Sequence, residues 1–347
     1  MTETIEEILS KHIRPVTDKD ENLPRFSYSK LDLFDSCNYK YKLKYIDGNY
    51  SDSEAIHLEL GTLAHKILEL KGRWKADGIE VDEEKYNYLR EIYKNGIEEK
   101  TDKGTEKIIG VEEIKKKYFE NFYQPDNASG MNYLEKSELF ENVVVRKEME
   151  EDDGWKVWQN EYKFEFVFRF PIDETEEWKE VVIHGFIDRV DKDDNGNYRV
   201  VDYKTSKKTY DEKKMATPMQ MCIYSFALFN EFGVLPIEHK YDFIFIDKTQ
   251  KACTKGYAKR ALKKLVKQMN KIEKLAKTEE YVCSPTPLCH WCDFCETNPD
   301  APFKGLCQYY SLWTPDNKTF QVNKQWDGGS SSVSQKTEDK PKRKLVF

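Results

Sequence analysis

Long apolar runs are missing from this chain of 347 residues. A helix needs about 20 apolar residues in succession to cross a bilayer, and no such run occurs, so we expect neither a transmembrane helix nor a membrane partner. The acidic segment from Met1 to Pro15 has no signal-peptide core. These two absences predict an intracellular protein.

A surplus of positive charge is also missing, since the formal net charge is -7. Nucleic-acid-binding proteins are often basic, so this charge counts mildly against such a partner. It does not exclude a local basic patch, and carboxylates that hold a metal add negative charge. The chain also lacks internal repeats and a Gly-x-x-x-x-Gly-Lys-Ser/Thr motif, so we expect any P-loop motor to be a separate chain.

The most informative residues that are present lie in two successive apolar runs, 184–191 and 198–205. A tight turn between two strands would bring Asp188, Asp202 and Lys204 to the same end of a small sheet. Paired carboxylates hold hard divalent cations through oxygen, and a lysine beside the cation can orient or help to deprotonate a water molecule. The pattern therefore predicts metal-assisted hydrolysis of a phosphodiester.

Hydrophobic periodicity predicts a single α/β core with additions. We expect helices over 27–45, 58–74, 218–232 and 255–277, and strands over 161–170, 180–190, 197–204 and 241–247. Outside this core we expect a loosely attached leader over 1–24, a helical insertion over 77–150, and a disordered tail over 316–347 that ends in basic and apolar residues.

Five motifs in a fixed order resemble those of the RecB-like branch of the PD-(D/E)XK nuclease superfamily. They are Ser27-Tyr28-Ser29-Lys30-Leu31 with Cys37, Gly61 to His65, Gly185 to Arg189, Val201 to Thr205, and Gln220 with Tyr224. The resemblance covers roughly residues 25–310 outside the insertion. It implies a restriction-endonuclease-like core over 25–315, in which helices flank a small mixed central sheet. It also implies the cytoplasm of a bacterial or phage-infected cell, and it leaves a phage origin open.

The resemblance assigns a role to each candidate site residue. Asp188 and Asp202 would ligate Mg²⁺ or Mn²⁺, helped by His65 and by the backbone carbonyl of Tyr203. Lys204 would orient the attacking water and offset charge that develops on the phosphate. The remaining candidates are Gln220 and Tyr224, which would position the scissile strand, Lys207 and Lys208, which would contact DNA phosphates, and Glu69, a possible secondary ligand.

Each motif also has an ordinary structural reading. An Asp-x-Lys at the end of a strand is usually a solvated pair, and a lone histidine on an apolar helix is usually a core residue. The order of the motifs favours the catalytic reading for Lys204 and His65. We interpret His184 as structural, and the aromatic alternation over 162–170 as core packing rather than a base-stacking platform.

Cysteine is crowded near the C-terminus, where five of the eight residues fall between 283 and 307. In a reducing compartment such crowding indicates metal or cluster ligation rather than disulfides. The resemblance extends to iron–sulfur members, including AddB-type helicase–nuclease subunits and CRISPR-adaptation exonucleases. It implies a 4Fe–4S cluster on Cys37, Cys289, Cys292 and Cys307. We favour Cys307 over Cys295 because Cys295 would crowd the cluster. The alternative is a structural Zn²⁺ held by Cys283 or Cys289 with Cys292, Cys295 and Cys307.

Taken with the resemblance, these features predict a Mg²⁺- or Mn²⁺-dependent exonuclease that acts on DNA ends in recombination, repair or replication and favours single strands. Flap endonuclease activity stays open. The alternatives are a non-catalytic DNA-binding subunit and a CRISPR spacer-processing nuclease. The terminal Arg343-Lys344-Leu345-Val346-Phe347 loosely resembles sliding-clamp-binding peptides. It leaves a clamp, a helicase or a single-strand-binding protein as candidate partners, beside the simpler reading of an unbound tail.

Overall fold

The computed structural model describes residues 3–50, 56–101, 104–117, 145, 154–206, 208–252, 257–286, 289, 291–296, 298, 301–307, 311–314 and 319–322. The chain divides into two compact units. The first comprises residues 1–15, 54–166 and 185–262, and the second comprises 16–53, 167–184 and 263–347. The candidate metal-binding residues belong to the first unit, and the clustered cysteines belong to the second.

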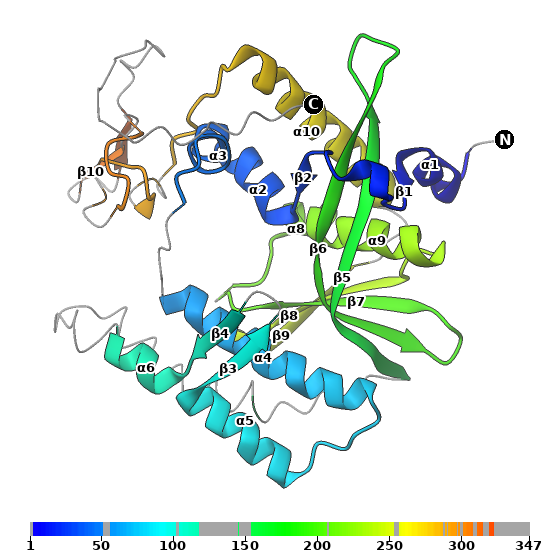
Figure 1. The fold of residues 1–347 in the computed structure, drawn as a ribbon, viewed down its shortest axis with the longest axis vertical. Helices are drawn as coiled ribbons and strands as arrows, with labels where there is room; N and C mark the ends of the chain where they lie inside the picture. Colours follow the sequence, from blue (N-terminus) through cyan, green and yellow to red (C-terminus); the bar gives the residue numbers. More distant parts are fainter. Residues whose placement is uncertain are drawn as a thin grey trace. The chain divides into compact units, whose positions relative to one another are not determined.

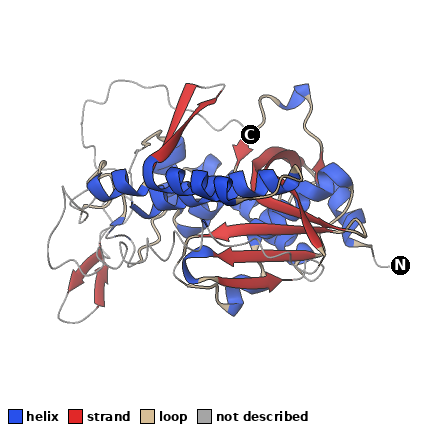
Figure 2. Cartoon of the chain, turned by 90° about the horizontal axis from the view of Figure 1, so that it is seen from below, coloured by secondary structure: helices blue, strands red, loops and turns tan. Residues whose placement is uncertain are grey.

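A mixed sheet of seven strands organises the fold (Figure 1). Its strand order is β1-β5-β6-β7-β8-β9, and β2 (Arg25–Phe26) pairs with β6 off this path. The other strands are β1 (Ile13–Arg14), β5 (Trp155–Pro171), β6 (Trp178–Asp193), β7 (Tyr198–Lys204), β8 (Glu238–Phe243) and β9 (Lys248–Ala252). Strand β7 is antiparallel to β6 and parallel to β8, whereas β9 runs antiparallel to β8, and these mixed directions can be followed in Figure 2. The predicted α/β class and restriction-endonuclease-like sheet are confirmed.

Two helices of the first unit lie on opposite sides of β7 and β8 in Figure 1. Helix α4 (Ile56–Ala76) buries Leu63, Ile67 and Leu68 in one core cluster with Val201 and Tyr203 of β7. Helix α9 (Met219–Phe232) is nearly all apolar and buried through its first ten residues, apart from Gln220. Because side chains alternate across a strand, β7 can pack against α4 and still direct Lys204 toward α9.

The hairpin between β6 and β7 forms where the sequence predicts it. One Asp193 side-chain oxygen accepts hydrogen bonds from the backbone N–H groups of Asn195 and Asn197, at 3.0 and 2.7 Å. Gly196 adopts a φ of 82°, a region that favours glycine because it lacks a Cβ. The aromatic alternation of β5 is likewise core packing, since Phe164, Phe166, Phe168 and Phe170 are all buried.

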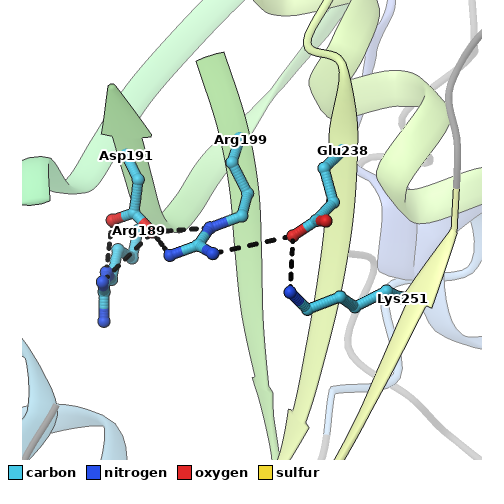
Figure 3. Close-up of polar contacts among 5 residues, drawn as sticks. All are labelled: Arg189, Asp191, Arg199, Glu238 and Lys251. Atoms are coloured by element: carbon cyan, nitrogen blue, oxygen red, sulfur yellow. Dashed lines mark hydrogen bonds and ion pairs between the residues drawn. The ribbon is translucent and has the colours of Figure 1, made fainter. Parts of the chain in front are cut away.

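A line of alternating charges crosses four strands and was not foreseen (Figure 3). Asp191 on β6 is fully buried and pairs with Arg189 on its own strand and with Arg199 on β7. The line continues from Arg199 to Glu238 on β8, at 3.6 Å, and from Glu238 to Lys251 on β9, at 3.4 Å. A buried guanidinium is stable only with partners, so this network constrains the register of the strands that carry the site.

Other parts of the fold differ from the expectation. The predicted helix over 27–45 begins at Ser27, whose side chain caps α2 (Tyr28–Ser36), but it is interrupted at Cys37. Cys37 has an extended backbone and caps a second helix, α3 (Asn38–Tyr41), which continues as a π-helical turn over Lys42–Ile46. The break turns the chain at the cysteine that was predicted to bind a cluster.

The expected leader and insertion contain more structure than their composition indicated. Residues 3–24 hold α1 (Ile5–His12), which has a Thr4–Glu7 capping box and a buried Leu9, and strand β1, which joins the sheet. The segment 77–150 holds α5 (Glu83–Asn95) and α6 (Val111–Lys115), and also a hairpin of β3 (Gly96–Thr101) and β4 (Gly104–Ile109). The hairpin strands carry Glu and Lys without an apolar alternation, so periodicity gave no signal for them.

The second unit also contains the long helix α10 (Ala258–Thr278), which begins in the first unit, and a hairpin of β10 (Ser311–Thr314) and β11 (Thr319–Val322). Strand β11 falls within the tail predicted over 316–347. The terminal basic and apolar peptide lies outside the described residues. The domain boundaries predicted from the sequence stay predictions.

Candidate active site

The adjacent strands β6 and β7 and the helix α4 bring a histidine and an aspartate together. The backbone N–H of Tyr203 on β7 donates a hydrogen bond of 2.7 Å to Asp188 Oδ2 on β6. The other oxygen, Asp188 Oδ1, lies 3.7 Å from His65 Nδ1 on α4. A single cation could accept a ligand from each, because ligands on one small ion lie about 3–4 Å apart.

Glu161 on β5 completes this group. Its carboxylate, His65 and Asp188 each offer a ligand atom, and these atoms all lie within 4.8 Å of one another. The three residues line a cavity of about 510 Å³, together with Glu69 and Thr205. Burial, followed by the charges of Asp188 and Glu69, raises the pKa of Glu161 to about 8.

Sequence reasoning missed Glu161. It precedes the aromatic alternation of β5 and is followed by Lys163 and Glu165 at equivalent polar positions, so nothing in the pattern distinguished it. The distinguishing feature is conformational, because Glu161 has a φ of 46° inside a strand. No local sequence motif predicts a positive φ at a glutamate within a strand.

Asp202 is placed beside the group and is fully buried. Lys204 Nζ lies 2.5 Å from Asp202 Oδ2, whereas Asp202 Oδ1 accepts no hydrogen bond from the described part of the chain. Burial raises the pKa of Asp202 to about 6, opposed by Lys204 and reinforced by Asp188. Its predicted role as a ligand, and that of the Tyr203 carbonyl, stay predictions.

Lys204 begins a polar chain that runs to α9. Its ammonium donates to Gln220 Oε1 at 2.9 Å, and Gln220 Nε2 donates to Tyr224 Oη at 2.8 Å. Burial acts to lower the pKa of Lys204, but Asp202 and other anionic groups raise it overall. The predicted Gln220–Tyr224 pair therefore lies next to the lysine, where it fixes the position of the ammonium.

The other predicted residues have more ordinary surroundings. Glu69 borders the cavity but is paired with Lys66, at 3.0 Å, and with Arg73. Lys66 also reaches Glu99 on β3, at 2.5 Å, which ties the hairpin to α4. Of the predicted phosphate contacts, Lys208 is exposed and Lys207 lies outside the described residues.

A second constellation of donors lies in the second unit. Six cysteines line a cavity of about 310 Å³: Cys37, Cys283, Cys289, Cys292, Cys295 and Cys307. The thiol of Cys307 lies 3.8 Å from that of Cys283, which also makes hydrogen bonds with Cys37 and Cys289. The four cysteines predicted as cluster ligands therefore border one cavity. Cys283 and Cys295, which belong only to the alternative zinc site, border the same cavity. Cys222, by contrast, is buried within α9.

These thiols also have shifted pKa values. The hydrogen bond from Cys283 lowers the pKa of Cys37 to about 5 and that of Cys289 to about 6. Burial raises the pKa of Cys292 to about 11. Thiolates are the form that binds iron and zinc, so sulfur donors in this arrangement suit either.

A mixed sheet flanked by helices, with carboxylates and a lysine on neighbouring strands, defines a nuclease of the restriction-endonuclease-like class. The family description "PD-(D/E)XK nuclease superfamily" matches residues 25–297, and the chain belongs to this family. The match and the motifs confirm the predicted RecB-like resemblance.

The curated relatives are much longer than this chain. They are the same component of an ATP-dependent helicase/deoxyribonuclease in three Streptococcus agalactiae strains, of serotypes Ia, V and III, and each is 29% identical over 195 residues. The match covers 55% of this chain but 15% of each relative. Among solved structures, Scheffersomyces stipitis Rai1 is 14% identical, with 80% of this chain and 79% of that chain covered. Its TM-score of 0.20 is too low to carry an argument.

Helices that could cross a membrane were expected to be absent. In the described part of the chain, no helix is both long and apolar enough to do so.

Proposed function

We propose that this protein is a Mg²⁺- or Mn²⁺-dependent exonuclease that hydrolyses phosphodiester bonds at DNA ends and favours single-stranded DNA. The observation that carries the proposal is the convergence of His65 on Asp188, with Lys204 held against Asp202 on the next strand. Membership of a nuclease superfamily and the deoxyribonuclease names of the relatives support it.

The donor set fits a divalent cation. Carboxylate oxygens are the ligands that Mg²⁺ and Mn²⁺ prefer, and the fully buried Asp202 Oδ1 has no hydrogen-bond donor among the described residues. His65, Asp188 and Asp202, with the Tyr203 carbonyl, would hold the ion. When bound, it supplies charge neutralisation and a more acidic water.

The chain's own residues would position the other reactants. Lys204 stays protonated beside Asp202, so it can donate a hydrogen bond to an attacking water or to a phosphate oxygen. Gln220 holds the ammonium from the side of α9, and Tyr224 holds Gln220. Lys207 and Lys208, together with this pair, would guide the strand into the cavity.

The cysteine-lined cavity is proposed to hold a 4Fe–4S cluster on Cys37, Cys289, Cys292 and Cys307, with a structural Zn²⁺ as the alternative. The single cavity with six sulfur donors supports a metal group. Such a group would join the segment of α2 and α3 to the segment 283–307, both within the second unit, and so restrict the unfolded chain.

The name of the relatives joins the deoxyribonuclease to a helicase, so we propose a helicase as partner, in DNA recombination or repair in the cytoplasm. A single-strand-binding protein or a sliding clamp is proposed for the C-terminal peptide. We also propose that the nuclease domain spans 25–315, between a leader and a tail.

The experiment compares linear and circular single-stranded DNA. With Mg²⁺ or Mn²⁺ the protein should shorten an end-labelled linear strand and leave the circle intact, and EDTA should stop the shortening of the linear strand. Lys204→Met should be inactive. Cleavage of the circle would show an endonuclease, and DNA binding without cleavage in either metal would show a non-catalytic subunit.

A further inference from the structure

We infer that Phe186 on β6 stacks against a base of the single DNA strand whose phosphate reaches the proposed metal site. The inference rests on the proposed function and adds an apolar contact with a base to the polar contacts proposed above. Three features of the molecule support it: the exposure of the ring, its place on β6 and the pairing of the charges around the site.

Phe186 is an exposed aromatic side chain in the interior of a strand. It is 53% exposed, although it lies well inside β6. The next residue, Ile187, is fully buried, and a Cβ on the preceding Gly185 would lie 3.1 Å from the Phe164 ring. One face of the strand therefore packs in the core here, while Phe186 lies on the other. A single exposed apolar residue is common on protein surfaces, so its location decides its meaning.

The exposed face of β6 at Phe186 also carries the site carboxylate. Side chains alternate across a strand, so Phe186 and Asp188 point to one face and Ile187 points to the other. Asp188 lines the cavity, and its Oδ1 lies 3.7 Å from His65 Nδ1. Two residues of a strand span about 7 Å, which is within the length of one nucleotide. A phosphate at the metal site would therefore bring a base within reach of the ring.

The pairing of β6 with β7 ends beside the site. The last pair is Arg189 opposite Val201. Beyond it, the backbone N–H of Tyr203 donates to the Asp188 side chain rather than continuing the ladder. Phe186 lies past this point, so it has no cross-strand neighbour within the described β6–β7 ladder. The ring therefore has no cover from β7, in agreement with its exposure.

The cations around the site are already paired within the protein. Lys66, on the cavity wall, has its Nζ 3.0 Å from Glu69 and 2.5 Å from Glu99. Lys204 Nζ lies 2.5 Å from Asp202, and the chain as a whole has a formal net charge of -7. Sequence-independent binding of DNA comes mainly from cations that neutralise phosphates, and stacking on aromatic side chains adds to it for single strands. Because its cations are paired, this site gains more from a stacked base than a basic groove would.

Stacking on Phe186 also connects to the proposed preference for single strands. In a duplex each base is paired and lies between its neighbours, so neither of its faces is open to a side chain. In a single strand a base can turn toward a ring, and because every base has a π-face, such stacking tolerates any sequence. The ring would therefore select unpaired ends without selecting a particular base.

The test replaces the bases of the substrate and keeps its phosphates. Degradation with Mg²⁺ compares an end-labelled single strand with the same strand made abasic over its terminal nucleotides, so that charge and length are equal. The variants are Phe186→Leu, Phe186→Trp and, as control, Trp178→Leu, which removes a 46% exposed aromatic side chain at the start of the same strand. Because both rings are exposed, each variant should melt close to wild type, and thermal unfolding checks this.

Wild type should favour the strand with bases by at least about fivefold in kcat/KM, the lower end of what one stacked base contributes. Phe186→Leu should lose this preference, through a higher KM on the strand with bases and an unchanged rate on the abasic strand. Phe186→Trp should keep the preference, because a larger ring also stacks, and Trp178→Leu should match wild type.

The outcomes separate this inference from the proposed function. Equal rates of wild type on both strands, or a preference that Phe186→Leu retains, would overturn the stacking role, while the hydrolysis itself would leave the proposed nuclease standing. An equal loss on both strands in Phe186→Leu would show a structural role for the ring and would also overturn the inference. If wild type degrades neither strand, both proposals fail.

Discussion

The backbone N–H of Tyr203 donates a hydrogen bond of 2.7 Å to Asp188 Oδ2. This bond ties the site carboxylate on β6 to the backbone of β7 and leaves Oδ1 to face His65, 3.7 Å away. One side chain therefore contributes both to the proposed metal site and to the contact between the two strands. A substitution that keeps the hydrogen bond but removes the charge separates the two roles.

Asp188→Asn is that substitution. The amide oxygen can still accept from Tyr203, so the melting temperature in EDTA should stay close to wild type. Nuclease activity should fall at least about tenfold, because a charged ligand is lost. Asp194→Asn, an exposed position at the tip of the hairpin, is the control and should retain full activity. A stable but fully active Asp188→Asn protein would contradict the role of Asp188.

Lys204→Met should affect both activity and stability, because Asp202 loses its counter-ion. We expect the rate of DNA hydrolysis to fall by about 100-fold or more, as when a preorganised donor is removed. The free energy of unfolding in EDTA should also fall, since Asp202 is fully buried and would then have neither Lys204 nor a metal ion beside it. Lys204→Met with Asp202→Asn should recover stability but not activity. Urea unfolding and a degradation assay measure the two effects, and recovery of both would contradict the assignment.

The sequence predicted the parts of the site that obey simple periodicity. Strands β6 and β7 and helices α4 and α9 follow from apolar spacing and from the Asp193–Gly196 turn, and they place Asp188, Asp202, Lys204 and Gln220. Glu161 could not be predicted, because its position depends on a positive φ that glutamate does not encode. The β3–β4 hairpin was missed for a related reason. It is held by strand pairing and by Lys66–Glu99, which are tertiary contacts between polar residues.

The break in the helix at Cys37 is also a feature that the local sequence pattern did not predict. The helical pattern over 27–45 continues through this residue, but in the structure the first helix ends there. The cysteine sulfur then caps a new helix by accepting a hydrogen bond of 3.4 Å from the Lys40 N–H. Tertiary placement of the sulfur near Cys283 overrides local helical preference. A pattern of residues in one segment cannot contain that information.

The cysteine cavity leads to a prediction about composition. Protein purified without oxygen should contain about four iron and four sulfide per chain if a 4Fe–4S cluster is present, or about one zinc if the alternative holds. Cys37→Ser should lose the cluster but keep a Zn²⁺, whose ligands in the alternative do not include Cys37, whereas Cys292→Ser should lose the metal in either case. Cys222→Ser, within α9 and not among the residues that line the cavity, should keep it. Elemental analysis and sulfide determination distinguish these results, and a metal-free wild type would contradict both.

His239 predicts how stability depends on pH. It is fully buried, its Nε2 lies 2.6 Å from Ser225 Oγ, and burial lowers its pKa to about 3. In the unfolded chain the pKa is about 6.5, so between these values only the unfolded state takes up the proton. The contribution of His239 to the free energy of unfolding is therefore fully present above about pH 6.5. It is lost as the pH falls toward the folded-state pKa, by about 1.4 kcal/mol per pH unit. His239→Gln should flatten this slope in urea unfolding between pH 6 and 4.5, roughly the range of that titration. An unchanged slope would rule out His239 as its source.

Gly72 on α4 has a steric requirement that sequence alone does not reveal. A Cβ there would stand 2.1–2.4 Å from the Asn160 side chain, whose Oδ1 and Nδ2 are buried and have no hydrogen-bond partner among the described residues. Gly72→Ala should therefore destabilise the protein by about 1–3 kcal/mol through overpacking, although alanine favours helices. Gly61→Ala on the same helix meets only Thr205 at 3.4 Å and should be neutral or stabilising. Adding Asn160→Ala to Gly72→Ala should restore stability, with a coupling of at least about 0.5 kcal/mol in a double-mutant cycle. Additive effects would show that the two side chains do not meet.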